Sequence, residues 1–169
     1  MEYLLVDGYN IINAWDDIFN LKRESLEECR CKLLDILSNY QGYKKLNIIV
    51  VFDAQFVKGG QEKQENFDNL SVVFTKENQT ADNYIERYVY KLGSIHRISV
   101  ATSDYLEQTI VLSYGGIRVP PGELKDEINR AGTDVKVDIA KHPKRANSII
   151  SHLKPDLLKK LEEIRRSKF

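Results

Sequence analysis

The chain has 169 residues, of which 42% are hydrophobic and 30% charged, and its 25 basic and 25 acidic side chains cancel. This composition is that of an ordinary globular domain with a substantial core. It argues against a membrane protein, because no apolar run approaches the roughly 20 residues that a span needs. Met1 leads into a short apolar segment without a basic leader, so we expect a cytoplasmic location. Cys29 and Cys31 are expected to be reduced thiols.

The first part of the chain alternates short apolar runs with one clear helical pattern. Residues 3–6 are predicted to form a buried strand, and a helix is predicted over 24–40, with Gly42 as its stop signal. Residues 46–52 form a nearly continuous apolar run, which is typical of a strand covered on both faces of a parallel sheet. The polar stretch 54–69 is predicted to be an exposed, mobile loop.

The second part of the chain continues this alternation of strand and helix. A strand is predicted at 71–74, a helix at 81–92, a strand at 97–101, a helix to about Tyr114 and a short strand at 117–119. The remainder is more polar and is predicted to be helical. This order predicts an α/β fold with a central, mostly parallel sheet of about five strands.

Basic side chains concentrate at the C-terminal end. Residues 141–169 contain nine basic and three acidic side chains, whereas residues 1–140 contain sixteen basic and twenty-two acidic ones. We therefore divide the chain into a domain of residues 1–140 and a basic helical extension of residues 141–169 that packs on the same domain. An acidic body with a basic end is a weak pointer to a nucleic-acid partner, and a solvated terminal helix explains it equally well.

Aspartates follow three of the predicted strands, at Asp7, Asp53 and Asp104. In open parallel sheets, ligands bind beyond the carboxyl ends of the strands, so these side chains should gather at one edge. Asp82 starts the 81–92 helix, and Glu86 follows one turn later on the same side. Such a cluster is tolerable if a divalent cation neutralises it, and oxygen ligands favour Mg²⁺ or Mn²⁺.

Each aspartate also has a purely structural explanation. Asp104 is well placed to cap the helix that follows it, and Asp7 to form a turn with Gly8. Asp82 would favour the dipole of its helix, with Thr80 as the cap. Taken singly, each residue favours the structural explanation, whereas four carboxylates at matching places in the fold favour a metal site.

The motifs around these residues resemble those of the NYN-domain ribonucleases, which belong to the PIN-like nuclease group, and within it the YacP-like proteins of bacteria. The four motifs occur in the family's order and at the expected strand ends: Asp7-Gly8-Tyr9-Asn10, Val51-Phe52-Asp53, Thr80-Ala81-Asp82 and Ala101-Thr102-Ser103-Asp104. The resemblance spans nearly the whole chain.

The resemblance implies a PIN-like, Rossmannoid three-layer fold and Mg²⁺- or Mn²⁺-dependent hydrolysis of single-stranded RNA. It implies that Asp7, Asp82 and Asp104 are metal ligands, that Asn10 positions the phosphate or a water, and that Asp53 supports the site. Three further side chains are candidates for a supporting role: Glu86, Thr102 and Ser103.

The resemblance also implies an endoribonuclease that cleaves mRNA on the translating ribosome, without a membrane partner or an organic cofactor. The basic extension would then contact RNA or the ribosome, through Lys141, Lys144, Arg145, Lys154, Lys159, Lys160, Arg165 and Arg166. The alternative is a non-catalytic RNA- or ribosome-binding module with a nuclease-like fold. A phosphatase or a receiver domain fits less well, because Gly8 and Tyr9 follow Asp7 where those folds place a second acidic residue.

Overall fold

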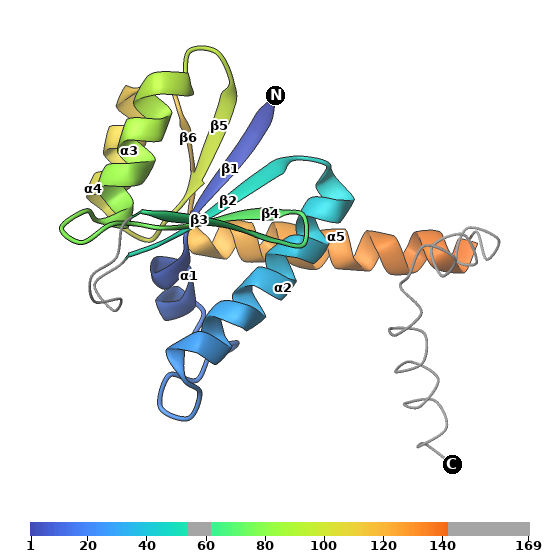
Figure 1. Cartoon of the computed structure of the whole chain (residues 1–169). Coiled ribbons are helices and arrows are strands. Elements are labelled where there is room, and N and C mark those ends of the chain that lie inside the picture. Colours follow the sequence, from blue (N-terminus) through green and yellow to red (C-terminus); the bar gives the residue numbers. More distant parts are fainter. Residues whose placement is uncertain (54–61, 142–169) are drawn as a thin grey trace. The chain divides into compact units, whose positions relative to one another are not determined.

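The structure is a computed structural model that describes residues 1–53 and 62–141, with side chains as far as Thr133 (Figure 1). Within these residues, six strands form one sheet in the order β3-β4-β2-β1-β5-β6. The strands are β1 (Glu2–Asp7), β2 (Asn47–Phe52), β3 (Lys63–Phe67), β4 (Leu70–Phe74), β5 (Arg97–Ala101) and β6 (Ile117–Val119). The helices are α1 (Gly8–Ala14), α2 (Leu26–Lys44), α3 (Ala81–Leu92), α4 (Tyr105–Ser113) and α5 (Pro121–Lys141).

The sheet is covered on both faces, as the continuous apolar strands predict. Successive side chains of a strand point to opposite faces, so Leu4 and Val6 of β1 join one core cluster and Leu5 joins the other. The first cluster includes side chains of α1, α2 and the start of α5, and the second includes side chains of α3 and α4 (Figure 1). Burying an aliphatic side chain of this size contributes about 1.5–3 kcal/mol. The predicted three-layer α/β fold is therefore confirmed, with six strands in place of about five.

The order of the strands reverses at β1, which lies between β2 and β5. Both neighbours run parallel to it, with Asp7 opposite Val51 on one side and Val6 opposite Ala101 on the other. The ends of these three strands therefore meet at one edge of the sheet, at the point where ligands bind in open α/β folds. The predicted convergence of the strand-end aspartates at one edge follows directly from this register.

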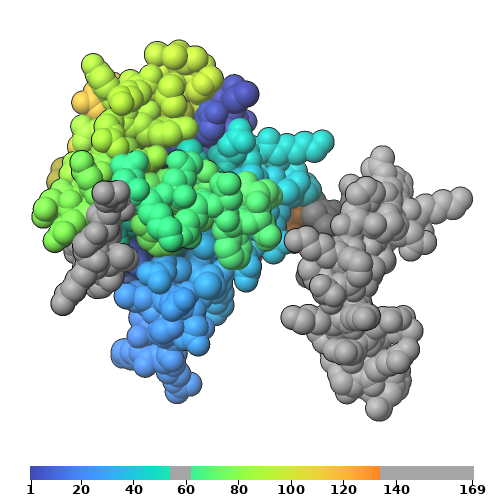
Figure 2. Space-filling view, viewed as in Figure 1, coloured from blue at the N-terminus to red at the C-terminus, as the bar shows by residue number. Residues whose placement is uncertain are grey.

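The prediction of a loop over 54–69 is wrong for its described part. Residues Lys63–Phe67 form β3, which pairs antiparallel with β4 across a tight turn at Asp68, whose φ is 51°. Four of the five β3 residues are exposed, because this edge strand has a neighbour on one side only, and Figure 2 shows the hairpin at the molecular surface. A strand without an inward apolar face has no alternating pattern of apolar and polar residues, so β3 could not be recognised from the sequence.

Two helical features also differ from the prediction. The short helix α1 begins directly at the end of β1, where a tight turn was expected, and Asp7 caps it. The helix α2 continues through Gly42 and ends at Lys44, and Lys45 adopts the left-handed conformation with φ 55°. A glycine inside the last turn costs only about 1 kcal/mol relative to alanine, so it does not by itself end a helix.

The chain divides into two compact units, Met1–Ala131 and Gly132–Phe169. The first holds the whole sheet, and the described part of the second is the end of α5. Of the predicted extension 141–169, only Lys141 is among the described residues, so its boundary and its packing stay predictions. No helix in the described residues is long and apolar enough to cross a membrane. Cys29 is buried and Cys31 exposed, and neither forms a disulfide.

Candidate metal centre

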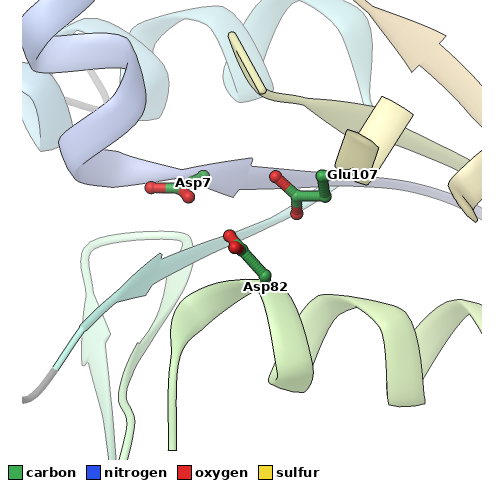
Figure 3. Close-up of side chains that lie close together, drawn as sticks. All are labelled: Asp7, Asp82 and Glu107. Atoms are coloured by element: carbon green, nitrogen blue, oxygen red, sulfur yellow. The ribbon is translucent and has the colours of Figure 1, made fainter. Parts of the chain in front are cut away.

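Three carboxylates from three different elements converge at the edge of the sheet (Figure 3). Asp7 ends β1, Asp82 lies in the first turn of α3, and Glu107 lies in the first turn of α4. One oxygen atom of each lies within 4.8 Å of those of the other two. Asp7 and Glu107 are each only 4% exposed, and Asp82 is half-buried. Three acidic groups this close and this dry form a candidate site for a hard divalent cation.

Asp7 is held in place by its neighbour Asn10. Its Oδ1 accepts the backbone N–H of Asn10 at 3.1 Å, and its Oδ2 accepts the side-chain amide of Asn10 at 2.6 Å. The hydroxyl of Ser103, after β5, donates in turn to Oδ1 of Asn10. Asp7 thus caps α1 as well as facing the cluster, so both explanations considered for it hold at once. A chain of hydrogen bonds links the ends of β5 and β1 through Asn10.

The position of Asp82 in the cluster is fixed by the cap at the start of α3 and by the packing of this helix on the core. Thr80 caps α3 by accepting the N–H of Asn83 at 3.2 Å, and Ala81 and Ile85 are buried in the core. Burial raises the pKa of Asp82, and the nearby charges of Asp7 and Asp104 raise it further. Burial also raises the pKa of Asp7, although its two hydrogen bonds from Asn10 oppose the shift. Both pKa shifts favour the protonated, neutral carboxyl groups, so the negative charge of ionised Asp7 and Asp82 is not offset by nearby basic side chains in the described part of the chain.

Glu107 is the most unusual member of the cluster. Neither of its carboxylate oxygens has a hydrogen-bond partner of good geometry among the described residues. Burial raises the pKa of Glu107 to about 8, the adjacent Thr102 hydroxyl opposes this shift, and the charges of Asp82, Asp7 and Asp104 add to it. A buried, unpaired carboxylate is costly unless a cation or proton satisfies it. The two unpartnered oxygens are the observation that a divalent cation at this position would explain.

Asp104 has the structural role that the sequence analysis considered for it, as the cap of the following helix. Its Oδ1 accepts the N–H groups of Leu106 at 2.7 Å and Glu107 at 3.2 Å, so it caps α4. Thr102 accepts the N–H of Asp104 through its hydroxyl at 3.1 Å and the amide of Gln108 through its carbonyl at 2.7 Å. Thr102 and Asp104 thus fix the start of the helix that carries Glu107. Direct metal ligation by Asp104 stays a prediction, and Glu107 takes the third position in the cluster.

A pocket of about 410 Å³ opens beside the cluster. Among the residues that line it are Asp7, Asn10, Asp53 and Asp82. Asp53 is half-buried, and its charge raises the pKa of both Asp7 and Asp82, so the predicted supporting residue lies within the field of the site. Glu86 is half-buried one turn beyond Asp82 and is not part of the three-carboxylate cluster.

The basic side chains predicted to bind RNA or the ribosome lie outside the described side chains. They are Lys141, Lys144, Arg145, Lys154, Lys159, Lys160, Arg165 and Arg166. Their assignment therefore stays a prediction from the sequence. The candidate metal centre belongs to the unit Met1–Ala131 alone.

Glu107 was missed by the sequence analysis, although a signal for it exists. Val111 is buried and lies one turn after Glu107, so the two share a face of α4. Tyr105 and Leu106, by contrast, are 76% and 72% exposed. The helix therefore turns a glutamate toward the core and two apolar side chains outward. An acidic residue on the buried stripe of a helix is the pattern that points to a functional site.

Comparison with known proteins places this geometry in a family. The family model described as YacP-like NYN domain matches residues 4–166. The chain is 40% identical over 167 residues to the uncharacterized protein YacP of Bacillus subtilis, and the match covers 98% of both proteins. The crystal structure of Rae1 (YacP) from Bacillus subtilis has a TM-score of 0.74 at 40% identity, covering 98% of this chain and 95% of that one. A crystal structure of a Rae1 point mutant has a TM-score of 0.70 at 37% identity, covering 90% of this chain and 85% of that one.

Proposed function

The chain belongs to the YacP-like NYN domain family, and from this premise we propose that it is a metal-dependent endoribonuclease that hydrolyses single-stranded RNA. The nuclease-like family supports RNA as the substrate. The observation that carries the metal dependence is the buried cluster of Asp7, Asp82 and Glu107, in which neither Glu107 oxygen has a hydrogen-bond partner of good geometry among the described residues. A protein that only binds RNA gains nothing from carboxylates that repel phosphates, so the cluster favours cleavage over simple binding.

The cluster fits Mg²⁺ or Mn²⁺ better than a softer metal. Its ligands are carboxylate oxygens, without a histidine or a thiolate in the group. Asp7, Asp82 and Glu107 would hold the cation. When bound there, a divalent cation supplies a Lewis acid that neutralises charge on a phosphodiester and makes water more acidic.

The remaining polar residues orient these ligands. Asn10 holds both oxygens of Asp7 and is itself held by Ser103, so it sets the direction in which Asp7 presents its free lone pairs. Asp104 and Thr102 hold the first turn of α4 and thereby fix Glu107. We assign Asn10 and Ser103 as positioning residues, and Asp53 as a carboxylate that adds to the negative field of the pocket.

We further propose that the natural substrate is mRNA on the ribosome, in the cytoplasm. The support is the family resemblance together with the excess of basic residues after position 140. Cleavage by an activated water, without attack by a 2′-hydroxyl, leaves a 5′-phosphate and a 3′-hydroxyl. These end groups distinguish the proposed route from a metal-free one.

The test is cleavage of labelled single-stranded RNA by the purified full-length chain, with and without ribosomes, in Mg²⁺, Mn²⁺ or EDTA. We expect internal cuts with 5′-phosphate ends in either metal and none in EDTA. Asp7→Asn and Asp82→Asn should each abolish cleavage while leaving the circular dichroism spectrum unchanged. Full activity of the double variant would refute the acidic site, and RNA binding without cleavage under every condition would support a non-catalytic binding module.

A further inference from the structure

The half-buried Arg30 of α2 has no carboxylate partner within the part of the chain that the structure describes. Arg30 lies in α2, where its Nη1 donates to the hydroxyl of Tyr9 at 3.0 Å. Its guanidinium also lies over the ring of Phe74, 5.9 Å from the ring centroid. Among the described residues, no aspartate or glutamate forms an ion pair with it. By contrast, Arg87 pairs with Glu62 and Arg97 with Glu2.

Arg30 is connected to the lining of the pocket through two neighbouring residues, Tyr9 and Leu26. Tyr9, which accepts its hydrogen bond, lies two residues after Asp7 and lines the same pocket. Leu26 also lines this pocket and lies one turn before Arg30 on the same face of α2. The Tyr9 ring is fixed edge-on to Phe52 at 5.2 Å, and Phe52 is fully buried. The packed Tyr9 ring therefore fixes the hydroxyl that Arg30 contacts, so the guanidinium is held next to a residue of the pocket lining.

The donor capacity of Arg30 is largely unused. A guanidinium carries five N–H donors in a planar fork that matches two phosphate oxygens, and the described contacts of Arg30 use one donor. The neighbouring pocket is lined by Asp7, Asp53 and Asp82, which repel a polyanion. The Arg30 guanidinium, next to this pocket lining, offsets the repulsion and prefers a phosphate to a neutral ligand.

We propose that Arg30, oriented by Tyr9 and Phe74, binds a phosphate of the RNA strand adjacent to the phosphate that is cleaved. The proposal rests on the proposed endoribonuclease function and assigns part of its substrate binding to the domain that holds the metal centre. Arg30 is then a substrate-binding residue, and Tyr9 positions it. The basic extension is not required for this contact.

The test measures binding of a fluorescein-labelled, single-stranded RNA to the full-length chain in EDTA, by fluorescence anisotropy at several salt concentrations. Arg30→Gln should weaken binding by about tenfold to a hundredfold, because it removes a charge-assisted hydrogen bond. It should also lower the slope of log K against log salt by about 0.7, as expected for one lost phosphate contact on single-stranded RNA. Arg30→Lys should keep the salt slope and lose part of the affinity, because lysine retains the charge without the fork.

The matched control is Arg87→Gln, which removes another arginine stacked on a ring, 5.6 Å from the centroid of Tyr84. This variant should bind RNA with the wild-type salt slope. Mn²⁺ affinity and the thermal midpoint of Arg30→Gln report whether the metal centre and the fold survive, and both should stay near wild type.

Two outcomes overturn the assignment of Arg30. An Arg30→Gln chain that binds RNA with wild-type affinity and salt slope shows that Arg30 does not contact phosphate. Equal losses in Arg30→Gln and Arg30→Lys, with a lower thermal midpoint and an unchanged slope, show that Arg30 only joins α1 to α2. Cleavage of RNA by the wild-type chain is measured in parallel, and if it occurs in either case, the proposed function stands. A wild-type chain that neither binds nor cuts RNA removes both proposals together.

Discussion

Glu107 is an ionisable group in an environment that disfavours its charged form. It is buried in the first turn of α4, beside two aspartates and without hydrogen-bond partners of good geometry among the described residues. In the metal-free protein it holds its proton up to about pH 8, whereas the unfolded chain releases that proton near the ordinary pKa of 4.5. Unfolding therefore releases a proton between these two pH values, and the folded state loses stability as the pH rises through this window.

The first prediction concerns this pH dependence in EDTA. Between about pH 5 and pH 8, the free energy of unfolding should fall by up to about 1.4 kcal/mol per pH unit because of Glu107. Glu107→Gln cannot release a proton, so it should flatten the profile and be more stable than wild type at pH 8. Chemical unfolding monitored by circular dichroism at pH 5, 6, 7 and 8 measures the effect.

The control for this prediction is Glu77→Gln, which alters an exposed glutamate outside the cluster and should keep the wild-type slope. Mn²⁺ should raise the thermal midpoint of the wild type more at pH 8 than at pH 6, because binding displaces protons. This increase should disappear in Glu107→Gln. If the two proteins respond equally to pH and to Mn²⁺, Glu107 is not part of a metal centre.

The sequence identified Asp7 and Asp82 but not Glu107, and the reason is physical. Asp7 and Asp82 stand where strands end and helices begin, and these positions are visible from the apolar pattern. The signal for Glu107 is weaker, because the apolar residues of α4 lie on both sides of the helix and its orientation in the structure is needed to show which side is buried. Glu107 also lies three residues after the cap Asp104, where an acidic side chain commonly interacts with the helix dipole whichever way it points.

At the scale of elements, the junction of β1 and α1 controls the geometry of Asp7 and Asn10. The glycine between them permits a close approach. A Cβ atom on Gly8 would lie 2.2 Å from Cε1 of Phe52, a fully buried ring that packs against Tyr9 and Phe74. Gly8 is therefore required by packing against β2, whereas its motif suggested only a turn.

The second prediction is that Gly8→Ala displaces this junction. The added methyl group must move Phe52 or the start of α1, which should lower the free energy of unfolding by about 1–3 kcal/mol. It should also shift the Asn10 amide that holds Asp7, so RNA cleavage should fall more than the fraction of folded protein does. Urea unfolding and cleavage assays on the same preparation check both effects.

Gly42→Ala is the matched control for this change. Gly42 is inside α2, and apart from its chain neighbours and the nearby backbone of its own helix, no atom of the described residues lies within 4 Å of a Cβ built on it. Its replacement should therefore stabilise the protein by about 0.5–1 kcal/mol and leave cleavage unchanged. Wild-type stability and activity in Gly8→Ala would show that the close contact with Phe52 relaxes without consequence.

The strands that the sequence predicted well are those that are buried on both faces of the sheet. Residues 46–52 and 97–101 became β2 and β5 almost at the expected bounds, because a strand inside a parallel sheet must be apolar throughout. The edge strand β3 escaped prediction because four of its five residues are exposed, so it lacks the apolar pattern that marks a strand, although its partner β4 follows directly in the chain. Short α1 escaped because only seven residues follow β1 before the helix ends.

At the scale of the whole molecule, strand order matters more than any single motif. The chain builds β2 and β4 on one side of β1 and then crosses to β5 and β6 on the other side. This crossing brings residues near positions 7, 53, 82 and 107 to one edge. The sequence predicted that convergence from the rule for parallel sheets. It did not predict which three carboxylates lie together and which neighbouring aspartate only caps a helix.

The last prediction concerns cleavage by the acidic part of the chain and binding by its basic C-terminal end. Deleting residues 154–169 removes six basic and three acidic side chains, and it leaves the unit that carries the candidate metal centre intact. Each lost phosphate contact lowers the salt slope for single-stranded RNA by about 0.7. We therefore expect weaker association with ribosomes in a sedimentation assay and a flatter salt dependence. Cleavage of a short free RNA should persist, because Arg30 and the three carboxylates remain.

A full-length variant with glutamine at Lys159, Lys160, Arg165 and Arg166 separates charge from chain length in this experiment. If charge attracts RNA, this variant should behave like the truncated chain in sedimentation and should keep the thermal stability of the wild type. If both variants sediment with ribosomes as the wild type does, residues 154–169 have no part in binding. Contacts within residues 1–153, Arg30 among them, would then have to account for the association.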